Sequence, residues 1–170
     1  MQQLTHHQNR FTAKKFPVTV VCDTVTSPAN VGTIFRTADA FGVENIIFCG
    51  AVPDFGKRMQ KTSRSTEKYV PFEYKEDILD VVADLKNRGY TVCSVEITDT
   101  SIPLPEVPFK LHNKIALVIG AENYGVSEMV LNQSEYITHI TMYGANSSMN
   151  VAQALTLALY ECTKIFDVVK

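Results

Sequence analysis

The sequence predicts an α/β fold in which helices cover both faces of a parallel β-sheet. Short apolar stretches of strand length alternate along the chain with segments of helical periodicity, the pattern of strand–helix–strand units. Residues 115–119 are apolar at every position, which is typical of a central parallel strand buried on both faces. The chain has 170 residues, of which 45% are hydrophobic and 20% charged, so it can bury a sizeable core.

The first strand is expected at 18–22. A helix should begin at Ser27 and Pro28, because Ser is a favoured N-cap and Pro a favoured first helical residue. Apolar residues then recur at helical spacing as far as Gly42, which is the expected C-terminal stop. A second strand, 45–49, follows at once, and the residues after it show no clear periodicity until the next helix.

Further elements are expected in the second half of the chain, where a proline-containing stretch, 98–113, predicts an extended loop. The expected elements are a helix over about 76–88, strands over 90–97, 115–119 and 137–142, a short helix near 126–132 and a helix over about 149–168. No repeat, low-complexity tract or linker is visible. The expected organisation is therefore a basic N-terminal arm, 1–16, followed by a single domain, 17–170.

The composition argues against several classes of protein. The sequence contains neither the G-x-G-x-x-G of dinucleotide-binding proteins nor the G-x-x-x-x-G-K-[ST] phosphate loop. Its four cysteines form no C-x-x-C pair and no metal-spaced cluster with histidine, so buried thiols in a reducing compartment and no metal site are expected. No apolar run approaches the roughly 20 residues of a membrane span, and the N-terminus lacks the apolar core of a secretory signal. The cytoplasm is the expected location.

Three segments place polar residues where an apolar element meets a loop, which is where ligands bind in open α/β sheets. In the first, Asn30 lies in the first turn of a helix, and Arg36 points away from the apolar face of that helix. In the second, Gly120 ends the all-apolar strand and Glu122 follows it. In the third, a Gly-Ala-Asn-Ser-Ser loop at 144–148 separates a strand from a strongly apolar helix.

Each segment also has an interpretation that needs no ligand. Arg36 can be a solvated surface residue, Gly120 can permit a turn, and Ser147 or Ser148 can cap the last helix. Capping does not account for the last helix itself, because apolar residues surround nearly its whole circumference. Such a helix must be buried on all sides, so the sequence predicts a homodimer in which a second subunit covers one of them.

Two stretches are rich in basic residues, although the net charge of the chain is −2 at pH 7. The arm has no acidic residue, and the stretch 57–75 carries six Lys or Arg against two acids. A run of charges is usually only a solvated surface, but phosphate contacts supply most of the non-specific affinity for nucleic acid. The candidate RNA-binding residues are Arg10, Lys14, Lys15, Lys57, Arg58, Lys61 and Arg64.

Together and in this order, the three polar segments resemble the signature motifs of the SpoU/TrmH-like 2′-O-ribose methyltransferases of the SPOUT superfamily. The resemblance covers about residues 17–165, and the one departure is Met where the third motif of the family has Leu. The matching residues are Asn30 and Arg36 in the first motif, Gly120, Ala121 and Glu122 in the second, and Ser148, Met149, Asn150 and Val151 in the third.

The resemblance implies methyl transfer from S-adenosylmethionine to a ribose 2′-hydroxyl of tRNA or rRNA, without a metal. It also implies a C-terminal trefoil knot that binds the cofactor, and an obligate dimer. Cofactor contacts are implied for Gly120, Ile140 and Met149, and catalytic roles for Arg36, Asn30, Glu122, Ser148 and Asn150. Because a guanidinium stays charged at ordinary pH, the role expected for Arg36 is to hold a phosphate and stabilise the alkoxide.

Two alternatives remain open. The first is a wobble-position tRNA ribose methyltransferase of the same superfamily, which the compact chain would suit, although residues 30–42 look closer to the branch that acts on other tRNA or rRNA sites. The second is a non-catalytic RNA-binding protein on the same fold. The intact motif residues argue against it.

Overall fold

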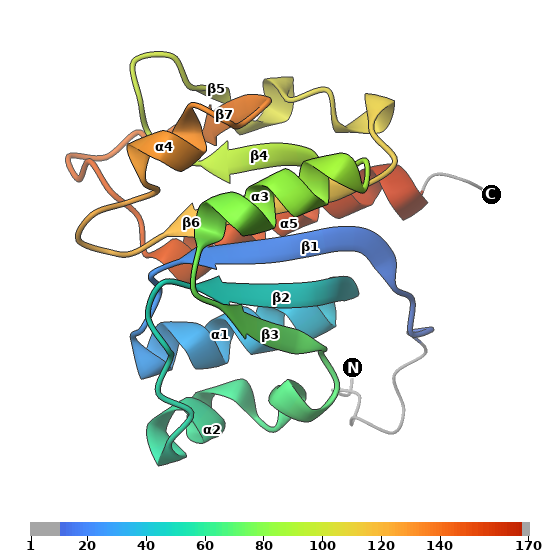
Figure 1. The fold of residues 1–170 in the computed structure, drawn as a ribbon, viewed down its shortest axis with the longest axis vertical. Helices are drawn as coiled ribbons and strands as arrows, with labels where there is room; N and C mark the ends of the chain where they lie inside the picture. The colour runs from blue at the N-terminus through green and yellow to red at the C-terminus, as the bar shows by residue number, and fades with distance from the viewer. Residues whose placement is uncertain (1–10, 168–170) are drawn as a thin grey trace, which may run out of the picture.

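The computed structural model describes residues 11–167, which form a seven-stranded sheet in which all neighbouring strands pair parallel (Figure 1). The strand order is β3-β2-β1-β6-β4-β7-β5, so β6 lies between β1 and β4, and β7 lies between β4 and β5. The strands are β1 (Phe16–Asp23), β2 (Val43–Cys49), β3 (Phe72–Lys75), β4 (Thr91–Val95), β5 (Ile102–Pro103), β6 (Ile115–Gly120) and β7 (Tyr136–His139).

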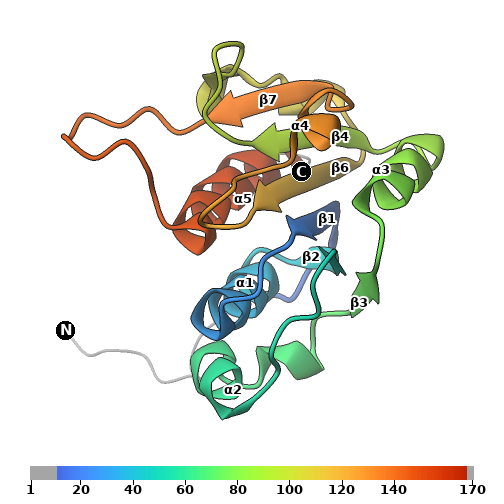
Figure 2. The ribbon, with the colours of Figure 1, turned by 60° about the vertical axis from the view of Figure 1, so that its left-hand side comes forward.

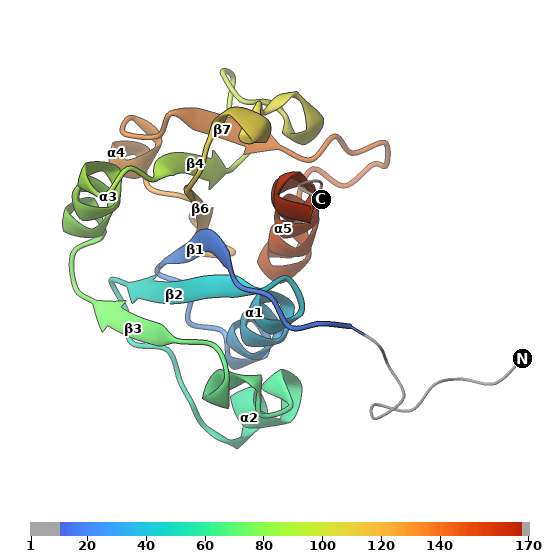
Figure 3. The ribbon, with the colours of Figure 1, turned by 90° about the vertical axis from the view of Figure 1, so that its right-hand side faces the viewer.

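Helices cover both faces of this sheet (Figure 3). The helices are α1 (Pro28–Ala40), α2 (Lys57–Ser63), α3 (Ile78–Asn87), α4 (Glu128–Leu131) and α5 (Val151–Asp167), and the short 3₁₀ turns are η2 (Thr66–Lys68), η3 (Leu104–Glu106) and η4 (Phe109–Leu111). Helices α1, α2 and α5 lie on one face and α3 and α4 on the other. The predicted α/β sheet with helices on both faces is therefore confirmed.

Two apolar clusters fill the two faces because side chains alternate along each strand. From β1, Val20 and Cys22 join the cluster that contains α1 and α5, whereas Val21 joins the cluster that contains α3 and α4. All six residues of β6 are buried, as expected for a central strand. None of the helices between residues 11 and 167 is long and apolar enough to cross a membrane.

The region without clear periodicity contains α2, η2 and β3, which the sequence did not indicate. A side chain on Gly32 of α1 would meet α2, since a Cβ there would lie 2.6 Å from the carbonyl oxygen of Met59 and 2.7 Å from Cβ of Thr62. Met59 itself is buried against the core. This two-turn helix therefore depends on its packing against α1, and an isolated helix of this length would be marginal in water.

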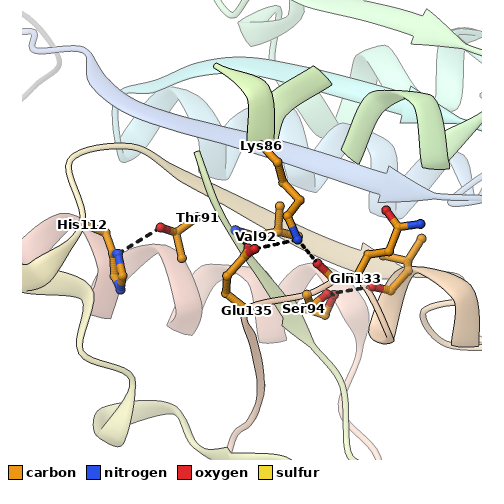
Figure 4. A network of polar contacts seen from close by, with 9 residues as sticks. Lys86, Thr91, Val92, Ser94, His112, Gln133 and Glu135 are labelled. Atoms are coloured by element: carbon orange, nitrogen blue, oxygen red, sulfur yellow. Dashed lines mark hydrogen bonds and ion pairs between the residues drawn. The ribbon is translucent and has the colours of Figure 1, made fainter. Parts of the chain in front are cut away.

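A polar cluster joins α3, β4 and the turn before β7 at the edge where the parallel strands begin, which we call the amino edge (Figure 4). Oε2 of Glu135 accepts the backbone N–H of Val92 at 2.7 Å, and its Oε1 lies 2.6 Å from Nζ of Lys86. Ser94 and Ser134 share a 2.7 Å hydrogen bond beside it. These contacts fasten the chain that leads into β7 onto β4.

Candidate functional site

Three side chains from distant parts of the chain meet at the opposite edge, where the parallel strands end, which we call the carboxyl edge. Nδ2 of Asn30 donates to Oε1 of Glu122 at 2.6 Å. Nδ2 of Asn150 donates to Oδ1 of Asn30 at 3.0 Å and to Oε1 of Glu122 at 3.1 Å. The structure thus brings together one residue from each of the three polar segments, and we call them the Asn–Glu–Asn cluster.

Each member of the cluster is placed by the end of a different element. Asn30 is buried in the first turn of α1, which follows β1, and Glu122 lies in the loop after β6. Asn150 directly precedes α5, and its Oδ1 accepts the backbone N–H groups of Ala152 at 3.0 Å and Gln153 at 3.3 Å. Asn150 is therefore the N-cap of α5, and the ligand-free interpretation in which Ser147 or Ser148 caps this helix does not apply.

A cavity of about 820 Å³ lies beside the cluster and is lined by the end of β4, the loop after β6 and the loop between β7 and α5. Figure 2 shows where these three segments lie in the fold. The three residues expected to contact a cofactor, Gly120, Ile140 and Met149, all line it. Ser148 lines it as well, although it is exposed and only its backbone N–H makes a described contact, to Oδ1 of Asn146 at 3.4 Å. The cavity volume is within the usual range for small-molecule sites.

Gly120 is required by the protein backbone. A Cβ on this residue would collide with the main chain of Gly125 and Val126, because the loop after β6 folds back through a bridge between Ala121 and Gly125. The sequence had suggested a close approach to a ligand. In the structure, Gly120 instead approaches the backbone of Gly125 and Val126, in the loop that shapes the cavity.

Two acidic residues that the sequence analysis missed hold the same loop in place. Oε2 of Glu96, directly after β4, accepts the backbone N–H of Val126 at 2.9 Å. Oδ2 of Asp23, the last residue of β1, accepts the backbone N–H of Ser127 at 2.9 Å. The only signal in the sequence was that both residues lie at strand ends. That position alone does not distinguish an acidic residue that holds a loop from an ordinary exposed one.

Arg36 lies outside the cavity lining and is exposed on α1, as its position on the helix predicted. At about 100° per residue, Arg36 is only about 40° around the helix from Gly32, the contact point with α2. It therefore lies on the side of α1 next to α2. The four basic candidates of the 57–75 stretch, Lys57, Arg58, Lys61 and Arg64, are all exposed on α2 or at its end.

Two basic residues of the arm, Lys14 and Lys15, lie elsewhere. Nζ of Lys15 donates to the carbonyl of Val43 at 3.0 Å, and the backbone N–H of Phe16 donates to the carbonyl of Gly42 at 2.8 Å. These contacts hold Lys14 and Lys15 at the amino edge, away from the Asn–Glu–Asn cluster. Arg10 lies outside the described residues.

None of the four cysteines lines the cavity. Among residues 11–167, no group of three or more His, Cys, Asp or Glu is arranged to hold a metal ion. All four cysteines are buried free thiols. Burial, with a contribution from Asp23, raises the pKa of Cys49 to about 12, and burial raises the pKa of Cys93 to about 12. These thiols are protonated at neutral pH and are poor nucleophiles.

The chain is similar to members of one known protein family. The model of the SpoU rRNA methylase family matches residues 17–160. A tRNA (guanosine(18)-2′-O)-methyltransferase of Thermus thermophilus is 31% identical over 150 residues, an alignment that covers 86% of this chain and 74% of the relative.

Two solved structures are similar in fold. The TrmH/SpoU tRNA modifying enzyme of A. aeolicus has a TM-score of 0.82 and 26% identity, covering 91% of this chain and 77% of that one. The AdoMet-bound rRNA methyltransferase of Sinorhizobium meliloti has a TM-score of 0.83 and 22% identity, covering 96% of this chain and 63% of that one. At 22% identity the likeness shows the fold alone.

Proposed function

Because this chain belongs to the SpoU rRNA methylase family, we propose that it transfers a methyl group from S-adenosylmethionine to a ribose 2′-hydroxyl of tRNA or rRNA. The observation that carries this proposal is the Asn–Glu–Asn cluster beside the cavity at the carboxyl edge. Three motif residues separated by up to 120 positions share hydrogen bonds there. Helix capping alone would require only Asn150.

The cavity fits S-adenosylmethionine in size and chemistry. Its volume of about 820 Å³ exceeds that of a single nucleoside, and its lining combines apolar side chains such as Ile140 and Met149 with the carboxylates of Glu96 and Glu122. Such a lining suits a ligand with an apolar ring, hydroxyl groups and positive charge. When bound, S-adenosylmethionine supplies an already activated methyl group, so the protein mainly positions the reactants.

The Asn–Glu–Asn cluster orients the part of the site that receives the RNA ribose. Glu122 uses Oε1 for both amide donors, and its Oε2 accepts no hydrogen bond from the described residues. That oxygen can accept a hydrogen bond from a ribose hydroxyl. We assign Asn30 and Asn150 to the orientation of Glu122, and Ser148 to the part of the loop that contacts the ribose.

Arg36 acts on the RNA. It does not line the cavity, and it lies on the side of α1 next to α2, the helix that carries exposed basic residues. Its guanidinium holds the phosphate next to the target ribose and stabilises the oxyanion that develops at the 2′-oxygen. Lys57, Arg58, Lys61 and Arg64 extend the phosphate-binding surface, whereas Lys14 and Lys15 form a second contact farther from the cavity. Arg10, outside the described residues, stays a candidate RNA-binding residue.

We also propose that the C-terminal part of residues 17–170, taken as one domain, forms a trefoil knot. The strand order supports this, because β6 and β7 each enter the sheet between strands that precede them in sequence. Knots are rare exceptions to the usual chain topology.

Burial of all four cysteines as free thiols supports the cytoplasm as the working compartment.

A homodimer is the proposed assembly. On α5, Leu157 is 40% and Tyr160 54% exposed, and the ring of Tyr160 stands edge-on against Phe41, which directly follows α1. These apolar side chains on neighbouring helices support contact with a second copy. Sedimentation of the purified protein should give about twice the 19.0 kDa chain mass, and a monomer at micromolar concentration would contradict a shared interface.

The activity is tested by incubating the protein with S-adenosylmethionine and RNA from a strain that lacks its gene. Mass mapping should find one new ribose methylation in tRNA or rRNA, and its position distinguishes a wobble nucleotide from other sites. Isothermal titration should detect binding of S-adenosylmethionine. Binding of RNA without any cofactor binding or methylation would instead support the non-catalytic RNA-binding alternative.

A further inference from the structure

Glu96 places a second carboxylate in the cavity, outside the Asn–Glu–Asn cluster. Its backbone N–H donates to the carbonyl of Thr138 at 2.9 Å, which ties the end of β4 to β7. Its Oε2 accepts the N–H of Val126 at 2.9 Å, and its Oε1 accepts the N–H of Ile97 at 3.0 Å. Both oxygens are therefore held by backbone donors, and the carboxylate is fixed in the cavity lining.

The loop after β6 packs directly against this carboxylate. Gly125 has a φ of +66°, and a Cβ there would collide with Oε2 of Glu96. The loop that carries Glu122 thus approaches Glu96 as closely as a glycine allows. Holding this loop in place would require only a neutral acceptor, since any side-chain oxygen can accept the N–H of Val126. The negative charge of Glu96 is not needed for that role.

The lining of the cavity is negatively charged. Within the described residues, it contains the carboxylates of Glu96 and Glu122 and no Lys or Arg, and its other titratable side chains are Tyr124 and His139. The groups that donate to the two carboxylates are backbone and side-chain amides, which leave both charges uncompensated. Two negative charges in a concave site favour a cationic ligand.

From this geometry we infer that Glu96 makes the cavity prefer S-adenosylmethionine over its product, S-adenosylhomocysteine. The inference rests on the proposed function, because it concerns the cavity assigned there to the methyl donor. In the transfer, a C–O bond forms to the ribose oxygen, the C–S bond breaks with its electron pair going to sulfur, and the hydroxyl proton is released. The donor is a sulfonium cation and the product a neutral thioether, so the product loses the attraction that held the donor and dissociates more readily.

The variant Glu96→Gln tests this inference because it removes the charge and keeps the side-chain size and one acceptor oxygen for Val126. Isothermal titration measures Kd for both ligands in wild type and variant. The affinity for S-adenosylmethionine should fall about three- to tenfold, the scale of losing one nearby charge in a partly solvated site, while that for S-adenosylhomocysteine stays within about twofold. In the wild type, added salt should reduce the preference for the donor.

Two further variants separate charge from structure. Glu96→Asp keeps the charge, so it should keep the preference for the donor even if both affinities fall. Glu128→Gln is the matched control, because Glu128 is exposed on α4 and does not line the cavity, and its ratio of affinities should equal that of the wild type.

An equal loss of affinity for both ligands in Glu96→Gln would overturn the inference and leave Glu96 with a structural role only. Unchanged affinities for both ligands, and hence an unchanged ratio of the two Kd values, would overturn it as well. Wild-type protein that binds both ligands with equal affinity contradicts this inference alone, whereas wild-type protein that binds neither overturns the proposed function too.

Discussion

The two edges of the sheet each carry a polar cluster centred on a glutamate, and the two glutamates use their oxygens differently. At the amino edge, Glu135 contacts Lys86 through one oxygen and the backbone N–H of Val92 through the other. At the carboxyl edge, Glu122 receives both amide donors on one oxygen, and its other oxygen accepts nothing from the described residues. The first arrangement joins elements of the fold, whereas the second leaves an acceptor beside a cavity.

The difference shows why a polar cluster alone does not indicate a site. Both glutamates are exposed, yet only Glu135 has each of its oxygens in contact with another group of the described protein. A carboxylate that is oriented by two amides and still has a free oxygen next to a cavity is arranged for an external partner. The following predictions test this distinction.

The largest effect is expected for Arg36→Ala. Methyl transfer should fall about 10²-fold or more, the scale of losing one donor to a developing oxyanion. The free energy of unfolding should change by no more than about 0.5 kcal/mol, because the side chain is exposed. Single-turnover transfer and urea unfolding measure the two quantities. Arg36→Lys should restore little activity, since an ammonium cannot reproduce the planar fork, and full rescue by lysine would contradict the proposed phosphate contact.

Gly120→Ala should damage the carboxyl edge through its backbone. The new Cβ would displace the loop at Gly125 and Val126, so stability should fall by about 1–3 kcal/mol and cofactor affinity should fall with it. Urea unfolding and isothermal titration measure these effects. Gly144→Ala is the control, because a Cβ on Gly144 meets no atom within 4 Å and should change neither quantity. Normal cofactor affinity in Gly120→Ala would mean that this loop does not shape the binding site.

A smaller effect is expected when the basic residues of α2 are removed. Changing Lys57, Arg58, Lys61 and Arg64 together to Ala should weaken RNA binding and flatten its salt dependence, because fewer counterions are released. Cofactor affinity should stay the same. The pair Lys14→Ala and Lys15→Ala, at the amino edge, should weaken RNA binding less. A larger loss from the arm pair than from α2 would reverse the proposed path of the RNA.

The sequence predicted the features that depend on local pattern. The alternation of strands and helices, the fully buried β6 and the family were all predicted and confirmed. The expected cofactor residues lie in the cavity lining, and Asn30, Glu122 and Asn150 meet in space, although their roles remain predictions.

Features that depend on long-range contacts could not be predicted. Helix α2 is stabilised by packing at Gly32, and no periodicity in its own seven residues indicates it. Glu96 and Asp23 act through backbone N–H groups that lie 30 and 104 residues away, so their roles appear only once the strands are paired. The N-cap of α5 is Asn150, which the sequence did not single out from Ser147 or Ser148 because Ser and Asn are similarly favoured at that position.

The central claim is that the carboxyl-edge cluster performs chemistry and the amino-edge cluster does not. The most direct measurement compares Glu122→Gln with Glu135→Gln, two identical changes at opposite edges, in single-turnover methyl transfer and in urea unfolding. Glu122→Gln should lower transfer about tenfold or more with little effect on stability. Glu135→Gln should lower the free energy of unfolding by about 1 kcal/mol and leave transfer by the folded protein unchanged. Wild-type transfer by Glu122→Gln, or an equal loss of transfer in both variants, would contradict the account.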